Sequence, residues 1–237
     1  MKKLAIILLF LFPLSSFAGL TFGAATSDRV AITGDASFQD KTTFTTAMWV
    51  YPTTFTDSRV LWALGTSDRK RIALSTPLSF GCRIAKATTN AVSVASNNTL
   101  TLNAWNFIAC TWTDGAAPKI YIGTRTSLVE ESSYASQSAG SGANSSESGG
   151  NMQWGNSLAN NLALQGRIGW GGYWDRELTL GELKQQQFSP HKTSGNQVFM
   201  HLGFSGLTTQ TDWSGARNNG TITGATLSRH VPLGRLF

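Results

Sequence analysis

Carboxylates have the widest chemical range of the side chains in this sequence, because a pair of them can cleave a glycosidic bond. Such a pair must lie about 5 to 10 Å apart, across the scissile bond. Two acids at alternate positions of one strand would share a face and meet this requirement. None of the 13 acids follows that pattern, since all fall in predicted loops, at strand ends or in a predicted helix. The nearest approach is Asp175 with Glu177, which begins the turn into that helix and is interpreted as capping and solvating it.

The three histidines, His191, His201 and His230, are scattered along the chain. They lack the spacing of a metal-ligand set, and none forms a recognisable motif with a serine or cysteine nucleophile. We therefore expect them to be structural or surface residues. No catalytic residue is assigned, and the sequence indicates a protein that is not an enzyme.

Cys82 and Cys110 are the only cysteines, and both lie in predicted strands. In an oxidising compartment an even cysteine count favours a disulfide, which would contribute about 3 to 4 kcal/mol through the chain entropy of the loop it closes. Strand pairing would have to bring the two Cα atoms within about 7 Å. Two buried free thiols are the alternative.

The elements that position these side chains are mostly strands. The chain has 24 glycines and only 14% charged residues, which leaves little material for amphipathic helices. Short apolar runs separated by turn residues predict an all-β protein, a two-sheet antiparallel β-sandwich of the jelly-roll type. The predicted strands are Leu20 to Ala24, Arg29 to Ile32, Phe44 to Tyr51, Val60 to Gly65, Arg71 to Ser75, Ser79 to Ala85, Ala91 to Ala95, Trp105 to Thr113, Lys119 to Ile122, Met152 to Gly155, Gly166 to Trp174 and Gln197 to Leu202.

One short helix is predicted at residues 179–188. Thr179 and Glu182 form a capping box, in which each side chain bonds the backbone amide of the other residue. Leu183 and Phe188 supply a small apolar stripe, and Pro190 requires the helix to end before it. We interpret this helix as a structural cover for the sandwich.

The central strands are apolar on both faces, so we expect one face in the core and the other covered by loops or lining a groove. An aromatic ring on the second face could stack on a sugar, although core packing is the commoner fate of a tryptophan. The residues near loops or on this second face are candidate ligand contacts: Trp112, Trp154, Trp170 and Trp213.

The first residues read as a signal peptide. Lys2 and Lys3 precede the apolar run from Leu4 to Phe12, and Ser16-Phe17-Ala18 is a signal-peptidase site before Gly19. We expect a signal peptide at 1–18, a secreted, extracellular or periplasmic protein, and one domain at 19–237 with no membrane span. A Ser- and Gly-rich stretch at about 126–151 predicts a flexible loop within that domain.

Charge argues against a nucleic-acid partner. Removing Lys2 and Lys3 from the 19 basic residues leaves 17 against 13 acids, so the net charge falls from +6 to +4. The densest basic cluster, Arg69 to Arg71, follows Asp68 and is too short to track a phosphate backbone. A solvated turn is the favoured interpretation of this cluster.

Four segments follow one another in a characteristic order: TFTTAMWVYP (Thr43 to Pro52), LNAWNFIACTWTDG (Leu102 to Gly115), KIYIG (Lys119 to Gly123) and LQGRIGWGGYWDRELTLGEL (Leu164 to Leu183). Together they resemble the concanavalin A-like lectin/glucanase superfamily, and most closely its laminin G-like and pentraxin-like jelly rolls. The resemblance implies glycan binding or glycan cleavage. Glucanases of the superfamily carry their carboxylates at alternate positions of one strand, a ladder this sequence lacks, so binding is favoured.

The resemblance also implies a circular permutation. The stretch DWSGARNNGTITGA, Asp212 to Ala225, looks like a segment that opens many such domains, so we expect the strands near Phe22 and Ile222 to be neighbours. No cofactor is required. Relatives often bind calcium, which oxygen ligands from this region could hold; a turn built on Asx hydrogen bonds is the alternative, and Gly169 stands where many relatives carry an acid. The candidate ligands are Asp28, Asp212, Ser214, Asn218 and Asn219.

The leading functional hypothesis is a secreted, non-catalytic module that binds an extracellular glycan or a surface protein. The first alternative is a structural surface or virion protein that uses the jelly roll for protein contacts, with the apolar tail Val231 to Phe237 docking on a neighbour. The second alternative is a glycan hydrolase or lyase. The sequence does not specify an oligomeric state.

Overall fold

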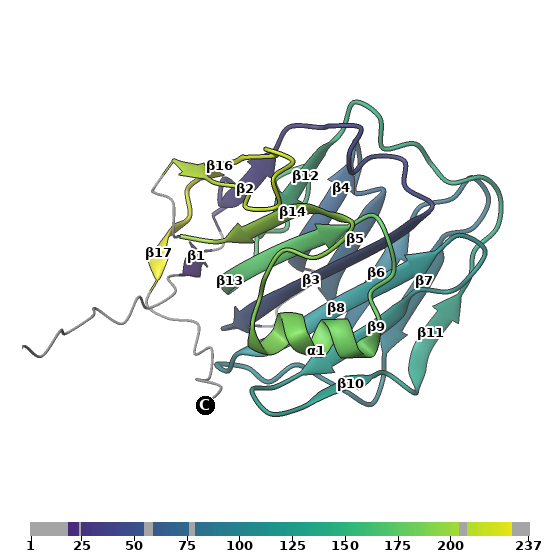
Figure 1. Ribbon diagram of the computed structural model, residues 1–237. Helices are drawn as coiled ribbons and strands as arrows, with labels where there is room; N and C mark the ends of the chain where they lie inside the picture. The colour runs from purple at the N-terminus through teal and green to yellow at the C-terminus, as the bar shows by residue number, and fades with distance from the viewer. Residues whose placement is uncertain (1–18, 24, 55–58, 76–78, 204–207, 229–237) are drawn as a thin grey trace, which may run out of the picture.

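The computed structural model describes residues 19–23, 25–54, 59–75, 79–203 and 208–228, which form two antiparallel sheets (Figure 1). The expected signal peptide at 1–18 and the tail at 231–237 lie outside the described residues. The predicted all-β sandwich with one helix is confirmed. The assignment of residues 19–237 to a single domain stays a prediction.

Sheet A holds the long central strands, and their order across the sheet differs from their order in the chain. In addition to the pairs of the main order given next, β14 (Asn196–His201) pairs with β13 (Gln165–Trp174). The order across the sheet is β10 (Leu128–Glu130), β9 (Lys119–Gly123), β8 (Asn106–Thr113), β3 (Thr43–Pro52), β13 (Gln165–Trp174), β1 (Gly19–Gly23) and β17 (Thr226–Ser228).

Sheet B packs behind sheet A. Its order is β11 (Tyr134–Ser138), β7 (Ala91–Ala95), β6 (Ser79–Ile84), β5 (Lys70–Ser75), β4 (Arg59–Gly65), β12 (Asn151–Trp154), β2 (Arg29–Ile32), β16 (Gly220–Thr223) and β15 (Thr209–Gln210). Strands β6 and β7 alternate buried and partly exposed residues, as a sheet with one core face requires.

The two faces of sheet A bury two different apolar clusters. Phe44 of β3 points into the core between the sheets, where its ring centroid lies 5.8 Å from that of Trp62 of sheet B. Trp49 of the same strand belongs to a second cluster on the outer face, together with Phe107 of β8 and Leu183 of the helix. The expectation of one core face and one covered face is therefore confirmed.

The helix α1 (Leu180–Phe188) lies across the outer face of sheet A (Figure 1). Both hydrogen bonds of the predicted capping box between Thr179 and Glu182 are present, and the helix ends before Pro190 as expected. The Trp49 indole Nε1 donates to the Gln187 carbonyl at 3.0 Å, which ties the helix to β3. Among the described residues, no helix is long and apolar enough to cross a membrane.

The stretch at 126–151, expected to be a flexible loop, contains strands β10 and β11 instead. β11 extends the edge of sheet B by pairing with β7, and isolated bridges join Lys86 to Asn144 and Thr89 to Ser141. Composition predicted a loop because Ser and Gly have low strand propensity, but an open sheet edge supplies backbone partners that composition does not report.

The basic cluster at residues 69–71 is not the solvated turn that its composition indicated. Lys70 begins β5 and is 1% exposed, and its Nζ lies 3.1 Å from Oε2 of the buried Glu147. Arg71 points to the opposite, outer face of sheet B, because successive side chains of a strand alternate.

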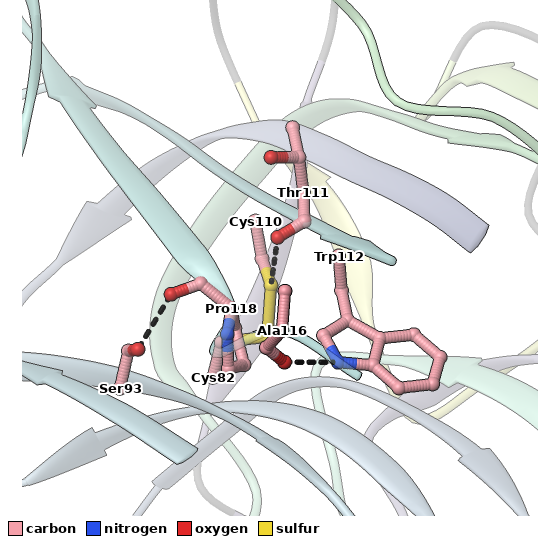
Figure 2. The surroundings of a disulfide bond; sticks show 7 residues. All are labelled: Cys82, Ser93, Cys110, Thr111, Trp112, Ala116 and Pro118. Carbon is pink, nitrogen blue, oxygen red and sulfur yellow. Dashed lines mark hydrogen bonds between the residues drawn. A yellow bond between two sulfur atoms is a disulfide. The ribbon is translucent and has the colours of Figure 1, made fainter. Parts of the chain in front are cut away.

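A disulfide joins Cys82 of β6 to Cys110 of β8, with the Cα atoms 6.3 Å apart (Figure 2). It links sheet B to sheet A, and both cysteines are fully buried. The predicted disulfide is confirmed. The two free thiols that stood as the alternative do not occur.

The two ends of the described chain meet, although not through the strands expected. β1, which carries Phe22, pairs with β17, and Leu20 stands opposite Leu227. Ile222 lies on β16 in the other sheet and pairs with Val30 of β2. The predicted adjacency is therefore correct for the terminal segments and wrong for the strand named.

Candidate functional site

Three of the four tryptophans expected to contact a ligand are buried. Trp112, Trp154 and Trp170 are 0%, 0% and 1% exposed, so none offers a ring face at the surface. Trp112 and Trp154 belong to the core between the sheets, and the Trp112 indole donates to the Ala116 carbonyl at 3.0 Å (Figure 2). Trp170 lies on the outer face of sheet A beneath Phe199, with ring centroids 5.8 Å apart. The prediction is wrong for these three.

Trp213 is the exception, because 49% of it is exposed. It follows β15, and its backbone N–H donates to the Phe199 carbonyl at 2.7 Å, which fixes it beside β14. Trp213 remains a surface candidate for ligand contact.

Among the candidate calcium ligands, Ser214, Asn218 and Asn219 all hydrogen-bond with Asp212. Asp212 accepts four hydrogen bonds: from the backbone N–H groups of Phe199, Ser214 and Asn218, and from the Ser214 hydroxyl. The Asn219 side chain accepts from the Asp212 N–H at 2.9 Å. These contacts occupy the carboxylate as an Asx-type turn does.

Asp28 has a separate role. Its Oδ2 accepts the Gly23 N–H at 2.6 Å, which holds the end of β1. Within the described part of the chain, no three His, Cys, Asp or Glu side chains gather as a metal site would require. Calcium binding stays an untested prediction.

The histidines take the places expected of structural or surface residues where they are described. His191 is exposed, and its Nδ1 lies 2.6 Å from the Ser189 carbonyl oxygen. His201 packs edge-on against Phe199, and burial lowers its pKa. His230 lies outside the described residues.

Two half-buried aromatic residues form a platform at the end of sheet A where β3 ends and β8 begins. Tyr51 and Trp105 meet edge to face, with ring centroids 5.5 Å apart. The Arg167 guanidinium lies 5.0 Å from the centroid of the Tyr51 ring. We call these three residues the aromatic platform. Burial on one side fixes the rings, and exposure on the other leaves area for a ligand.

A hollow of about 340 Å³ adjoins the platform. Trp105 supplies its aromatic wall, and exposed polar side chains supply the hydrogen-bonding groups. Hydroxyls and a guanidinium surround an apolar ring, which is the chemistry of a site for a polar ligand with one apolar face. The full lining is Thr101, Ala104, Trp105, Asn106, Thr124, Arg125 and Thr126.

Two buried amides hold the rim of this hollow in place. Asn106 bonds both the N–H and the carbonyl of Thr101 and the carbonyl of Ala104, which closes the loop that carries Trp105. On the other side, the Gln187 amide of α1 donates to the carbonyls of Thr124 and Ser127 at 2.5 and 2.7 Å. Both walls are therefore positioned before any ligand arrives.

The sequence contained a signal for this platform. Trp49 stands opposite Phe107 on β3 and β8, and both point to the outer face. Tyr51 lies two residues after Trp49, and Trp105 lies two residues before Phe107, so both are at the same end of the sheet. Because side chains alternate between the two faces, Tyr51 and Trp105 also point to the outer face. Trp112, the candidate chosen on β8, lies at the opposite end of that strand and faces the core.

The fold and part of the sequence match known proteins. A laminin G family model, described as the concanavalin A-like lectin/glucanases superfamily, matches residues 24–184, more than half of the chain. The chain belongs to the concanavalin A-like lectin/glucanases superfamily. The search of curated proteins found no match.

Solved structures share the superfamily fold at low identity. A Bacteroides ovatus protein, named as a candidate carbohydrate-binding protein, has a TM-score of 0.63 at 15% identity over 92% of this chain and 61% of its own. A heptameric SAP-like pentraxin from Limulus polyphemus has a TM-score of 0.60 at 9% identity, over 92% and 97%. The extracellular region of zebrafish Gpr126/Adgrg6 has a TM-score of 0.55 at 16% identity, over 91% and 26%. This chain thus spans less than two thirds of the Bacteroides and zebrafish chains.

The superfamily name covers lectins and glucanases, so the position of the carboxylates matters. Asp175 accepts from the Gln197 amide at 3.0 Å, and its carbonyl accepts from Thr43 at the start of β3. This is the end of β3 opposite to Tyr51. Glu177 is exposed in the turn before α1, as expected. Among the residues that the structure describes, no carboxylate lines the hollow beside the platform.

Proposed function

We propose that this protein is an exported, non-catalytic module that binds carbohydrate at the aromatic platform. The observation that carries the proposal is the half-exposed pair of Tyr51 and Trp105 beside a hollow of about 340 Å³ rimmed by hydroxyls and Arg125. Sugars present an apolar C–H face and a polar edge, so a ring next to fixed hydrogen-bonding groups complements them. The name of the similar Bacteroides protein is consistent with this reading.

Two further observations support the remaining parts of the proposal. The disulfide between the sheets favours an oxidising compartment, because structural disulfides are rare in the cytosol. The described lining of the hollow contains no carboxylate, which supports binding without cleavage, since cleavage in most glycosidases needs a pair of acids.

The proposal is tested with a glycan array, run with calcium and with chelator, followed by calorimetry on the best ligand. Trp105→Ala and Tyr51→Ala should each weaken binding by about tenfold or more, as the loss of an interface aromatic does. Trp213→Ala tests the other surface candidate, because it removes an exposed tryptophan away from the platform, and it should leave binding unchanged. Absence of binding to every glycan class in both conditions would refute the proposal, and loss only in Trp213→Ala would move the site to that residue.

Catalysis is tested separately. The protein should release no reducing ends from the polysaccharide it binds. Reducing-end release that disappears on substitution of Asp175 or Glu177 would make the protein an enzyme and overturn the non-catalytic reading.

A further inference from the structure

Two arginines face each other on the outer face of sheet B, away from the aromatic platform. Arg71 of β5 and Arg83 of β6 are direct register partners. Their neighbours Ile72, Cys82 and Ile84 are buried, so strand alternation turns both arginines outward. Side chains directly opposite on antiparallel strands lie about 5 Å apart at Cβ, and like charges at this spacing repel.

The pair borders a hollow of about 120 Å³. Its centre is open because Ala73 stands opposite Gly81, so two adjacent positions carry almost no side chain. Val92 and Val94 of β7 form an apolar wall on the far side. The hollow therefore combines cationic groups at one end with an apolar surface.

Neither arginine forms an ion pair within the described part of the chain, although the nearby Asp68 carboxylate attracts Arg83. None of the three ion pairs found there includes Arg71 or Arg83. Arg83 donates through Nη2 to the backbone carbonyl of Asp68 at 3.2 Å, whereas the Asp68 carboxylate accepts the Leu158 N–H. The Nε of Arg83 is buried without a hydrogen-bond acceptor. Burial and the adjacent Arg71 guanidinium lower the pKa of Arg83.

A protein gains no stability from two unpaired guanidiniums in register, and a buried donor without an acceptor is costly. An anion between the two side chains would remove both penalties, and guanidinium forks match the geometry of oxyanions. We propose that Arg71 and Arg83 form a site for the sulfate or carboxylate group of an acidic polysaccharide, with the sugar ring resting on Val92 and Val94.

The charge distribution favours an acidic sugar over a nucleic acid. The cationic groups meet at one hollow sized for a single acidic group, and a nucleic acid requires a track of cations along its backbone. The proposal is independent of the aromatic platform, which lies on the other sheet.

The test measures binding to immobilised dextran sulfate, polygalacturonate and neutral dextran at two salt concentrations. The first two polymers distinguish sulfate from carboxylate. We expect binding to at least one of them, weaker at high salt, with a loss of about tenfold or more in Arg71→Gln and in Arg83→Gln. Arg29→Gln is the matched control, because it removes one positive charge from the same face of sheet B on β2, with β4 and β12 between it and β5.

The proposal is overturned if the wild type binds neither acidic polymer, if the Arg71→Gln, Arg83→Gln double variant binds them unchanged, or if Arg29→Gln loses binding equally. Duplex DNA that competes at equal charge concentration would assign the site to phosphate backbones instead. Folding is monitored by thermal melting: the acidic polymer should raise the Tm of the wild type and leave that of the double variant unchanged. Failure of the platform proposal is recognised independently, because Trp105→Ala should not alter dextran sulfate binding.

Discussion

The side chain of Lys70 carries a charge in the interior of the sandwich. Its Nζ donates to Oε2 of Glu147 and to the Lys41 carbonyl at 2.8 Å, and it lies 5.1 Å from the Phe44 ring centroid. Burial lowers the pKa of Lys70 and raises that of Glu147, and the attraction between the two opposes both shifts. Glu147 also accepts the Asp40 N–H at 2.6 Å, so the pair fixes the 139–150 segment against β5.

Breaking this pair from one side should be costly. Glu147→Gln leaves an uncompensated buried cation and should lower the free energy of unfolding by about 3 to 5 kcal/mol. Adding Lys70→Met removes the cation, while the side-chain oxygen of the introduced glutamine still accepts the Asp40 N–H, so the double variant should recover most of the loss. Urea unfolding of the wild type, the Glu147→Gln and Lys70→Met single variants and the double variant gives the coupling energy. Additive losses would show that the two charges do not interact.

For individual residues, the sequence predicted which cysteines pair better than it predicted which tryptophans are exposed. The even cysteine count led to the correct disulfide. Three of four candidate tryptophans were wrong, because alternation divides a strand into two faces without saying which face meets the core. Packing against the other sheet or against α1 decides which face is covered by what, and it involves residues far apart in sequence. Trp170 does lie on the outer face, but the cluster that includes Leu183 of α1 buries it there.

The helix α1 is the element that local sequence determined most completely. Its start depends on Thr179 and Glu182, three residues apart, and its end on Pro190, so no distant residue is needed to predict it. The segment at 126–151 is the contrary case. β10 forms a local hairpin with β9, but β11 forms by pairing with the open edge of β7, which lies far away in sequence.

The capping box should make stability depend on pH. The Arg176 guanidinium, with the Thr179 N–H and hydroxyl, lowers the pKa of Glu182 from 4.5 to about 2. A lowered folded-state pKa gives stability that is present above pH 4.5 and is lost as pH falls toward 2. Glu182→Gln should therefore lower the free energy of unfolding by about 1 kcal/mol at pH 7.

Chemical unfolding from pH 7 to 2 measures this effect. The difference between wild type and Glu182→Gln should shrink as the pH falls below 4.5. Glu177→Gln is the control, since Glu177 is exposed in the preceding turn and makes no ion pair among the described residues. A difference that is constant with pH would mean that the carboxylate charge does not stabilise the helix.

For the whole molecule, the disulfide is the covalent bond between the two sheets. Cys82 and Cys110 are 28 residues apart in sequence, and both are fully buried in the core between the sheets. The bond therefore restricts the unfolded chain, because Cys82 and Cys110 stay joined when the sheets come apart.

Replacing both cysteines with alanine should lower the free energy of unfolding by about 3 to 4 kcal/mol, the chain entropy of a loop of this length. Equilibrium unfolding in urea measures the loss. In the native wild type, an alkylating reagent with reductant should label neither cysteine until urea is added. Rapid labelling of the native protein would contradict the burial of the bond.

The pairing of β1 with β17 has a consequence for how such a domain can be used. Gly19 and Ser228 are register partners, so the described chain begins and ends about 5 Å apart, one strand spacing. If residues 19–228 were inserted between two adjacent residues of a surface loop in a host protein, they would form an inserted domain joined to the host by two neighbouring chain segments. The two host residues would have to move apart only slightly. Because the two ends are close, they could also be joined to each other and the chain cut at another loop. This would change the order of the strands in the sequence without moving either sheet.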